Sequence, residues 1–225
     1  MAVIPIEIIS DPICPWCYIG YRSLQRTVAL YQKTYPGGSK DELDIIWKPY
    51  FIDQVEPTES VLINDRMARR MTASQINGAQ TRLTRVGKGL GIGFRFGGYI
   101  GSSRVAHRTL HLALERYGGL TQCELADRLF RSQFELEKDV SDVDVVISAA
   151  VESGMDETLV KEYLESDRDL NEVEEEARNA RGAGVQGVPL FLIGSGETKV
   201  RLEGAADMNE FFEAFAKARD SASCA

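Results

Sequence analysis

Two cysteines near the start of the chain are the residues best suited to chemistry. They are Cys14 and Cys17, the ends of the run Cys14-Pro15-Trp16-Cys17. A thiolate attacks one sulfur of a disulfide, and a second thiol nearby can then displace the bound partner. We expect a helix to begin at this run, and a helix N-terminus favours an anion. Cys14 is therefore predicted to be the attacking thiolate, and Cys17, one turn further on, the resolving thiol.

A close cysteine pair can also be one half of a zinc site. A structural zinc needs four ligands, and besides the pair the sequence offers Cys123, Cys224, His107 and His111. The two histidines are four positions apart and would share one face of a helix. Because none of these residues forms a second close cysteine pair, the spacing favours redox chemistry, and we predict no metal site.

The composition indicates a protein of a reducing compartment. Its 225 residues are 44% hydrophobic, enough to fill a core without cross-links, and four cysteines are too few for a disulfide scaffold. Residues 1–10 carry no basic leader, and no stretch approaches the ~18 apolar residues of a membrane span. We expect a cytoplasmic protein with no membrane segment. The formal net charge of -8 argues against nucleic acid as a partner, because binding it depends mainly on cations.

The two ends of the chain carry alternating strand and helix signals. Pro49 indicates that one of the strands lies at a sheet edge or bends there. The order of elements is β-α-β followed by β-β-α, which is the order of a thioredoxin fold. The patterns predict strands over 3–9, 43–52, 185–193 and 199–202, a helix from Pro15 to the stop at Pro36, and a helix over 208–219.

Between these ends the periodicity becomes helical. Seven glycines crowd residues 87–101, where a regular helix would be costly, so we predict a loop there. The fold class is therefore α/β, a thioredoxin fold with a large all-helical insertion. The predicted domains are a thioredoxin-like domain of residues 1–57 and 183–225 and an inserted helical domain of residues 58–182. Helices are predicted over 72–87, 103–117, 121–135, 143–153 and 156–181.

Three segments of the sequence resemble a known family. They are Asp11-Pro12-Ile13-Cys14-Pro15-Trp16-Cys17-Tyr18-Ile19-Gly20, Ala106-His107-Arg108 and Gly184-Val185-Gln186-Gly187-Val188-Pro189. Together they resemble the DsbA-like thioredoxin-fold proteins of the FrnE type, and the resemblance covers nearly the whole chain. It implies a thioredoxin fold with a helical insertion and an activity as a disulfide oxidoreductase or isomerase.

The same superfamily leaves an alternative open. It includes the 2-hydroxychromene-2-carboxylate isomerases and kappa-class glutathione transferases, which typically replace the first cysteine by serine and lack the second. Because this chain keeps both cysteines, we predict a protein disulfide oxidoreductase or isomerase. The alternative is a glutathione-dependent isomerase or transferase acting on a small aromatic or secondary metabolite. We expect no bound cofactor, glutathione as a candidate co-substrate, and protein or small-molecule thiols and disulfides as partners.

Several residues beside the cysteines are candidates for the site. The resemblance implies that Val188 and Pro189 form a cis dipeptide facing the cysteines, which would present the Val188 backbone to an extended substrate. Trp16 is predicted to contribute to substrate binding. Pro15 and His107 are further candidates, although a packing role is favoured for His107.

Charge and the remaining thiols give four more expectations. Nine Arg and Lys residues and no acidic residue lie between Arg66 and Arg108. This basic segment is either a solvated helix face or a positive rim that attracts glutathione carboxylates and stabilises the Cys14 thiolate. Glu7 could accept a proton from the resolving cysteine, but we expect it to face solvent. Cys123 is expected to be a small buried hydrophobe and Cys224 a tail thiol.

Overall fold

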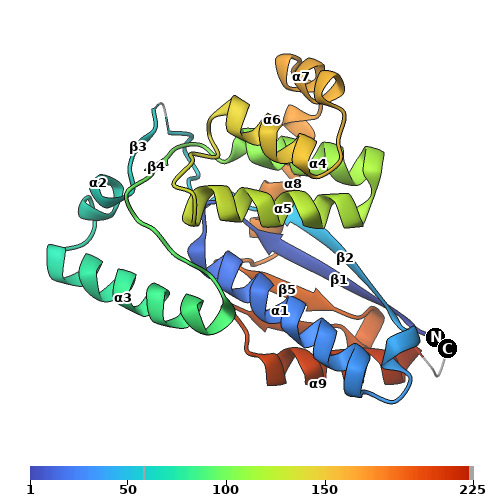
Figure 1. The fold of residues 1–225 in the computed structure, drawn as a ribbon. Helices are drawn as coiled ribbons and strands as arrows, with labels where there is room; N and C mark the ends of the chain where they lie inside the picture. The colour runs from blue at the N-terminus through green and yellow to red at the C-terminus, as the bar shows by residue number, and fades with distance from the viewer. Residues whose placement is uncertain (58, 223–225) are drawn as a thin grey trace.

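A mixed sheet forms the centre of the protein. We describe a computed structural model of residues 1–57 and 59–222 (Figure 1). The main sheet has four strands in the order β2-β1-β5-β6. β1 (Val3–Ser10) and β2 (Glu42–Pro49) are parallel, and β5 (Leu190–Ile193) is antiparallel to β1 and to β6 (Val200–Glu203). β2 lies at the edge, as its proline predicts.

Two helices cover one face of this sheet. α1 (Pro15–Thr34) follows β1, and α9 (Met208–Ala222) follows β6. Side chains alternate along a strand, and the residues of β1 on this face are fully buried: Ile4, Ile6 and Ile8. The chain thus builds β1-α1-β2 and β5-β6-α9, which confirms the predicted thioredoxin fold.

The chain leaves the sheet after β2 and returns at β5, and most of the segment between is helical. In Figure 1, α4 to α7 lie above the sheet, whereas α2 and α3 lie to the left, with α3 next to α1. α4, α5 and α8 contact β2, and α3 contacts α1. Their bounds are α2 (Ile63–Ala68), α3 (Ala73–Leu90), α4 (Arg104–Tyr117), α5 (Gly119–Phe134), α6 (Val143–Glu152), α7 (Glu157–Glu165) and α8 (Leu170–Gly182).

The insertion departs from the sequence prediction in two places. It is not all helical, because β3 (Val61–Leu62) and β4 (Tyr99–Ile100) pair as a short antiparallel ladder. The single helix predicted over 156–181 is two helices, α7 and α8. Between them the guanidinium of Arg108, which comes from α4, donates to the carbonyl oxygens of Tyr163, Ser166 and Arg168. The carbonyl oxygens at the end of α7 therefore bind a buried cation from another helix.

The glycine-rich stretch is a loop only from Gly91 onward. α3 runs through Gly87 to Leu90 and ends at Gly91, whose φ of +81° suits glycine. At Gly87 a Cβ would lie 2.6 Å from the Phe94 ring, so glycine lets the returning chain pack on the helix. The prediction of a loop over 87–101 is therefore wrong at its start.

Gln122 of α5 joins the helical segment to the edge strand. Its side-chain oxygen accepts from Trp47 N–H at 2.8 Å, and its amide nitrogen donates to the carbonyl oxygens of Trp47 at 3.1 Å and Leu110 at 3.2 Å. The Gln122 side chain thereby satisfies the backbone N–H and C=O of Trp47 on the outer edge of β2. Tyr18 of α1 stacks on Phe130 of α5 with ring centroids 5.2 Å apart.

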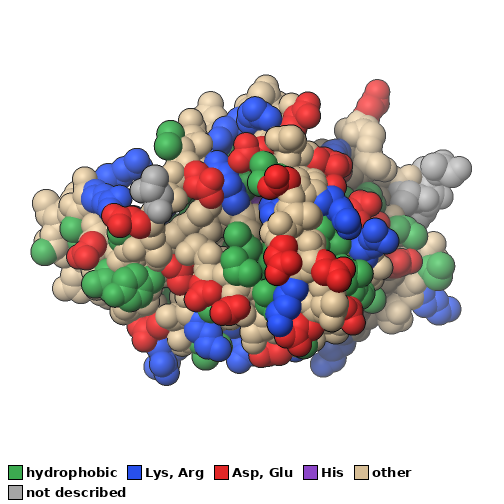
Figure 2. All heavy atoms as spheres, turned by 90° about the horizontal axis from the view of Figure 1, so that it is seen from above, with side chains coloured by type: hydrophobic (Ala, Val, Ile, Leu, Met, Phe, Trp, Pro, Cys, Tyr) green, Lys and Arg blue, Asp and Glu red, His purple; other side chains and the backbone are tan. Residues whose placement is uncertain are grey.

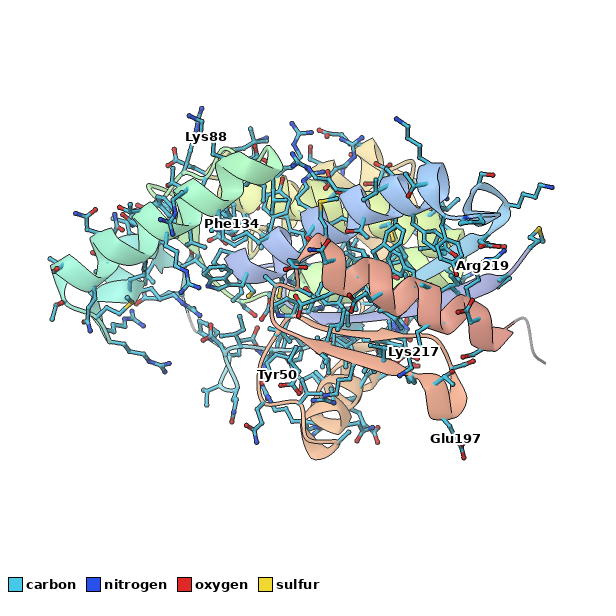
Figure 3. All side chains as sticks on the ribbon, turned by 90° about the horizontal axis from the view of Figure 1, so that it is seen from below. Tyr50, Lys88, Phe134, Glu197, Lys217 and Arg219 are labelled. Carbon is cyan, nitrogen blue, oxygen red and sulfur yellow. The ribbon has the colours of Figure 1, made fainter. Side chains whose placement is uncertain are left out.

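At the other end of the sheet, Asp41 ties three segments together, one of them the end of α9 that carries Arg219 (Arg219 is labelled in Figure 3). Its carboxylate accepts from Ala2 N–H at 2.8 Å, Tyr31 Oη at 3.0 Å and Arg219 Nε at 2.5 Å. Burial alone would raise the pKa of Asp41, but these hydrogen bonds outweigh burial and lower it. The end of α9 is thus fixed beside the start of β1.

The surface seen from above the helices carries both signs of charge. Acidic and basic side chains are interspersed over this face, with small hydrophobic patches between them (Figure 2). Within residues 1–57 and 59–222, none of the helices is both long and apolar enough to cross a membrane.

Candidate active site

The cysteine run lies where β1 ends and α1 begins. Cys14 N–H donates to the Asp11 carbonyl at 2.9 Å, which closes the turn between strand and helix. Cys14 is the N-cap residue with extended backbone, and Pro15 starts the helix, where a missing N–H costs nothing. No side chain of the described residues caps this helix start, and its first turn holds no acidic residue. The Cys14 sulfur is thus the group positioned to interact with the positive end of the helix dipole.

The segment before β5 lies against this sulfur. The peptide bond between Val188 and Pro189 is cis. Cys14 Sγ donates to the Val188 carbonyl oxygen at 3.7 Å, and the Cys14 residue is 5% exposed. Residues 174 positions apart in the sequence therefore meet at the Cys14 sulfur.

Cys17 lies one turn deeper and is 1% exposed. Burial raises the pKa of its thiol well above the ordinary value, and a hydrogen bond with Cys14 and the charge of Cys14 act in the same direction. The Ser10 hydroxyl and the Asp11 N–H oppose this rise in pKa. Cys17 is therefore a neutral thiol at pH 7, which suits a resolving cysteine better than an attacking one.

Trp16 lies between the cysteines and is half-buried against the core. The guanidinium of Arg82, from α3, lies over its ring at 4.8 Å from the centroid. This places one cation of the basic segment beside the cysteine run.

Other cations of the basic segment form ion pairs and hydrogen bonds within the protein. Arg66 forms a bidentate pair with Asp53, and Arg104 pairs with Glu174 at 2.9 Å. Arg108 is buried among backbone carbonyls. The segment is thus neither a simple solvated helix face nor a continuous positive rim, because acids from elsewhere in the chain neutralise part of it.

His107 is buried against the segments that follow β1 and β2. Its Nε2 is 3.2 Å from the Tyr50 carbonyl oxygen and 3.6 Å from Asp11 Oδ1, and its ring meets Phe51 edge to face. The Asp11 carboxylate, fully buried, also accepts from Ile13 N–H at 3.2 Å and Ile52 N–H at 2.8 Å. Asp11 therefore links the loops after β1 and β2, a role that sequence reasoning missed. The sequence feature that could have indicated this role is the position of Asp11 directly before a proline, at the end of a strand.

Gly20 is a second residue whose role the sequence did not reveal. A Cβ at this position would lie 2.9 Å from the Phe191 ring and 3.2 Å from Pro189 Cγ. Glycine therefore allows α1 to approach the cis-proline segment closely, which brings Cys14 to Val188.

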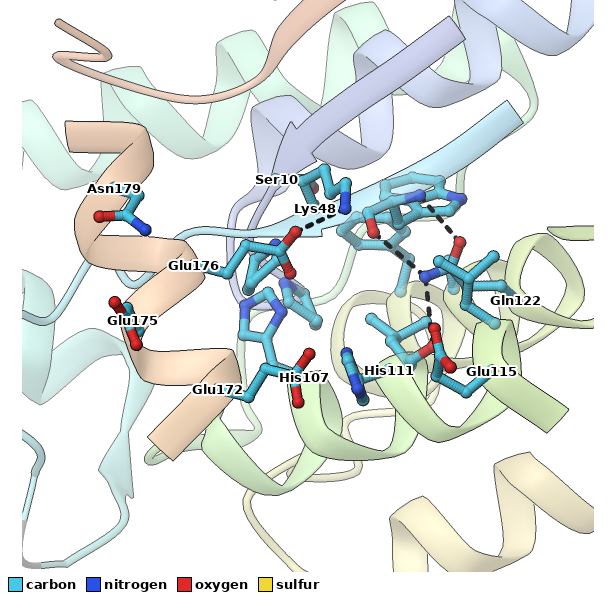
Figure 4. A pocket seen from close by; sticks show the side chains of 17 residues that line it. Ser10, Lys48, His107, His111, Glu115, Gln122, Glu172, Glu175, Glu176 and Asn179 are labelled. Carbon is cyan, nitrogen blue, oxygen red and sulfur yellow. Dashed lines mark hydrogen bonds and ion pairs between the residues drawn. The ribbon is translucent and has the colours of Figure 1, made fainter. Parts of the chain in front are cut away.

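A cavity of about 290 Å³ lies beside the cysteine run, between β2, α4, α5 and α8 (Figure 4). Ser10 and Pro12 are among its lining residues, and the Lys48 and Glu176 side chains, which also line it, form an ion pair at 2.5 Å. His107 and His111 of α4 both line it. No cysteine lines this cavity among the described residues.

One group of described side chains has ligands of the kind that metals use. His111, Asp169 and Glu172 place a nitrogen and two carboxylate oxygens within 4.8 Å of one another. Asp169 is the N-cap of α8, and Glu172 lies in its first turn. His111 and Asp169 are partly exposed, and Glu172 is exposed.

The third described cysteine is separate from the pair. Cys123 is half-buried in α5, where its sulfur accepts from Trp47 Nε1 at 3.4 Å and contacts the Ile45 carbonyl oxygen at 3.8 Å. Burial raises the pKa of its thiol. Cys224 lies outside the described residues.

Known proteins share the fold of this chain. The chain is 25% identical over 211 residues to YwbO of Bacillus subtilis, covering 93% of this chain and 94% of YwbO. It is similar to a probable DsbA oxidoreductase from Streptomyces coelicolor, with 25% identity, a TM-score of 0.82, and 96% and 89% of the two chains covered. It shares the fold of a putative protein disulfide isomerase from Nitrosomonas europaea, at 18% identity and a TM-score of 0.69, covering 95% and 96% of the chains. The family model of the DSBA-like thioredoxin domain matches residues 5–216. Since this match spans nearly the whole chain, the protein belongs to the DsbA-like thioredoxin family.

Proposed function

We propose that this protein is a thiol-disulfide oxidoreductase or disulfide isomerase that works through Cys14 and Cys17. The observation that carries the proposal is the 3.7 Å contact between Cys14 Sγ and the Val188 carbonyl oxygen. It places the first sulfur of a dithiol at a backbone segment before a strand. Two thiols separated by one helical turn can exchange with disulfides without a bound cofactor.

The reaction begins with the Cys14 thiolate attacking one sulfur of a client disulfide. A mixed disulfide forms between Cys14 and the client, and the other client sulfur leaves as a thiolate that takes up a proton. Cys17 then loses its proton and attacks Cys14 Sγ. The Cys14–Cys17 disulfide forms, the client leaves as a dithiol, and two electrons pass from the protein to the client. The reverse sequence oxidises a client.

Substrates of this reaction are protein or small-molecule thiols and disulfides. An extended client segment can pair with the Val188 backbone, in the manner of strand addition. Trp16, half-buried beside the sulfur, offers it an apolar contact. Glutathione is the proposed co-substrate that returns the pair to its starting state.

The test is to trap the intermediate in purified variants. Cys17→Ser is expected to accumulate a mixed disulfide between Cys14 and glutathione, since the thiol that releases it is gone. Cys14→Ser is expected to trap almost nothing. Cys123→Ser, made on the Cys17→Ser background, is the matched control and should trap as much as Cys17→Ser alone.

Mass spectrometry after incubation with glutathione disulfide gives the readout. Equal trapping by Cys14→Ser and Cys17→Ser would refute the assigned roles. If neither variant traps glutathione and the wild type binds it non-covalently, a glutathione-dependent isomerase or transferase replaces the proposal.

A further inference from the structure

The cavity between β2, α4, α5 and α8 is separate from the thiol chemistry, because none of the described cysteines lines it. Its volume is about 290 Å³. At about 30 Å³ per non-hydrogen atom, the share that one water molecule takes in the liquid, it holds a molecule of about ten such atoms. Small-molecule sites are concave and mostly apolar, with a few polar groups that orient the ligand. The lining therefore indicates which kind of molecule fits.

The buried part of the lining is mainly apolar. Its largest surfaces come from Trp47 of β2, Leu110 of α4, and Ala126 and Phe130 of α5, which are between 1% and 5% exposed. The buried amide of Gln122 also lines the cavity, but its amide nitrogen already donates to the carbonyl oxygens of Trp47 and Leu110. This part of the cavity therefore accepts an apolar group.

The exposed part of the lining is acidic. Glu115 of α4 and Glu172 and Glu175 of α8 line the cavity and are exposed (Figure 4). Their carboxylates form no ion pair or side-chain hydrogen bond with other residues of 1–57 and 59–222. Lys48 is the only lysine or arginine among the described lining residues, and it already pairs with Glu176 at 2.5 Å. Three carboxylates of this lining thus lack a protein cation.

His107 adds a hydrogen-bond acceptor to the buried part. The residue is 4% exposed and lines the cavity. Its Nε2 lies 3.2 Å from the Tyr50 carbonyl oxygen and 3.6 Å from Asp11 Oδ1, and since both are acceptors we assign the ring hydrogen to Nε2. Among the described residues no group hydrogen-bonds to Nδ1. In the neutral ring Nδ1 is an acceptor, and it suits a ligand that donates.

We infer that this cavity binds a small organic cation, an ammonium group on an apolar body, with about ten non-hydrogen atoms in all. The apolar body packs against Trp47, Leu110 and Phe130. An ammonium group has three donors and no acceptor, which matches the acceptors of the lining, the carboxylates and His107 Nδ1. The same carboxylates repel anions, so glutathione is not the ligand of this cavity. The inference does not depend on the proposed function.

The experiment titrates the full-length, ¹⁵N-labelled protein with three matched probes and follows its amide signals by NMR. The probes are 3-phenylpropylamine, 3-phenylpropan-1-ol and 3-phenylpropionate, which share one apolar body and carry a positive, a neutral and a negative end. EDTA in the buffer removes any divalent metal from the carboxylates. A ligand of this size is expected to bind with a Kd of about 1 mM.

The amine should bind about tenfold more tightly than the alcohol, because it forms charge-assisted hydrogen bonds, and the carboxylate should bind more weakly than both. The shifted amides should lie around Lys48, Leu110 and Gln122. Equal affinity for the amine and the alcohol, tightest binding of the carboxylate, shifts confined to the cysteine run, or no saturable shifts with any probe would overturn the inference.

Two variants separate charge from shape. Glu115→Gln combined with Glu172→Gln should weaken amine binding about fivefold and leave alcohol binding unchanged, since each exposed carboxylate contributes modestly. Leu114→Trp enlarges a half-buried side chain that lines the cavity, so it should abolish binding of both probes.

The charge-matched control combines Glu7→Gln with Glu162→Gln, two acids that do not line the cavity. Glu7 is partly exposed, as the sequence predicts, with its carboxylate 3.4 Å from Lys199 Nζ, and Glu162 is exposed on α7. This control should bind the amine as the wild type does. Equal weakening in the control and in the Glu115 and Glu172 variant would show that only the net charge of the protein matters, and the site would be rejected.

Discussion

Cys14 Sγ donates to the carbonyl oxygen of Val188 at 3.7 Å, although these residues are 174 positions apart in the sequence. The contact exists because β5 pairs with β1 in antiparallel register, with Ile9 opposite Leu190. The end of β1 thus brings the cysteine run to the segment that precedes β5. In the proposed reaction, exchange at Cys14 therefore takes place beside the Val188 backbone.

Oxidation is expected to join Cys14 to Cys17 and to leave Cys123 reduced. The pair shares one helix start, whereas the Cys123 sulfur is held by Trp47 Nε1 at 3.4 Å in a separate part of the core. Peptide mapping by mass spectrometry after mild oxidation checks this. A main oxidised species containing Cys123 would contradict the two-cysteine mechanism.

The reduced protein should lose stability as the pH rises above about 8.5, in part because of Cys17. Burial raises the folded-state pKa of this thiol, so the folded chain keeps a proton that the unfolded chain loses. Stability is then fully present below the unfolded pKa and is lost as the pH rises toward the folded pKa.

Cys17→Ala is expected to lack this loss, which reaches about 1.4 kcal/mol per pH unit in the wild type. Urea unfolding of both proteins under reducing conditions between pH 7 and 10 measures the difference. The two proteins differ only at position 17, so the difference between their curves reports Cys17. Parallel curves would show that burial does not hold the Cys17 proton.

Gln122→Leu should destabilise the protein by about 2–3 kcal/mol, because backbone polar groups of Trp47 and Leu110 would lose their buried partner. Denaturant unfolding monitored by circular dichroism gives the value. Gln32→Leu, at an exposed position of α1, is the control and should change stability by less than about 0.5 kcal/mol. Equal effects of the two substitutions would mean that Gln122 does not hold the edge strand.

Arg82→Ala should slow reaction with glutathione disulfide about threefold at low salt, with little change for a neutral disulfide such as hydroxyethyl disulfide. The Arg82 guanidinium lies over Trp16 beside the cysteine run, so its charge acts on anionic substrates. The effect should fade at high salt. Lys217→Ala removes the same charge near the end of α9, at the opposite end of β1 (Figure 3), and should leave the rate unchanged. A salt-independent loss would point to packing on Trp16 instead.

Local patterns in the sequence determined much of the fold. The strand before Cys14, the helix started by Pro15 and the final hairpin and helix were predicted because each depends on alternation, proline and glycine within a few residues. The same patterns identified the cysteine pair, since its chemistry follows from residue type and spacing. The family match over residues 5–216 confirms the thioredoxin fold inferred from them.

Only the tertiary structure decided how distant residues share this site. The division of one predicted helix into α7 and α8 depends on Arg108 of α4 binding the carbonyls between them. The burial of Cys17 depends on how α1, which carries it, packs against α3, α5 and α9. Burial and charge around a side chain are set by residues far away in sequence, and these contacts have no local pattern that could reveal them.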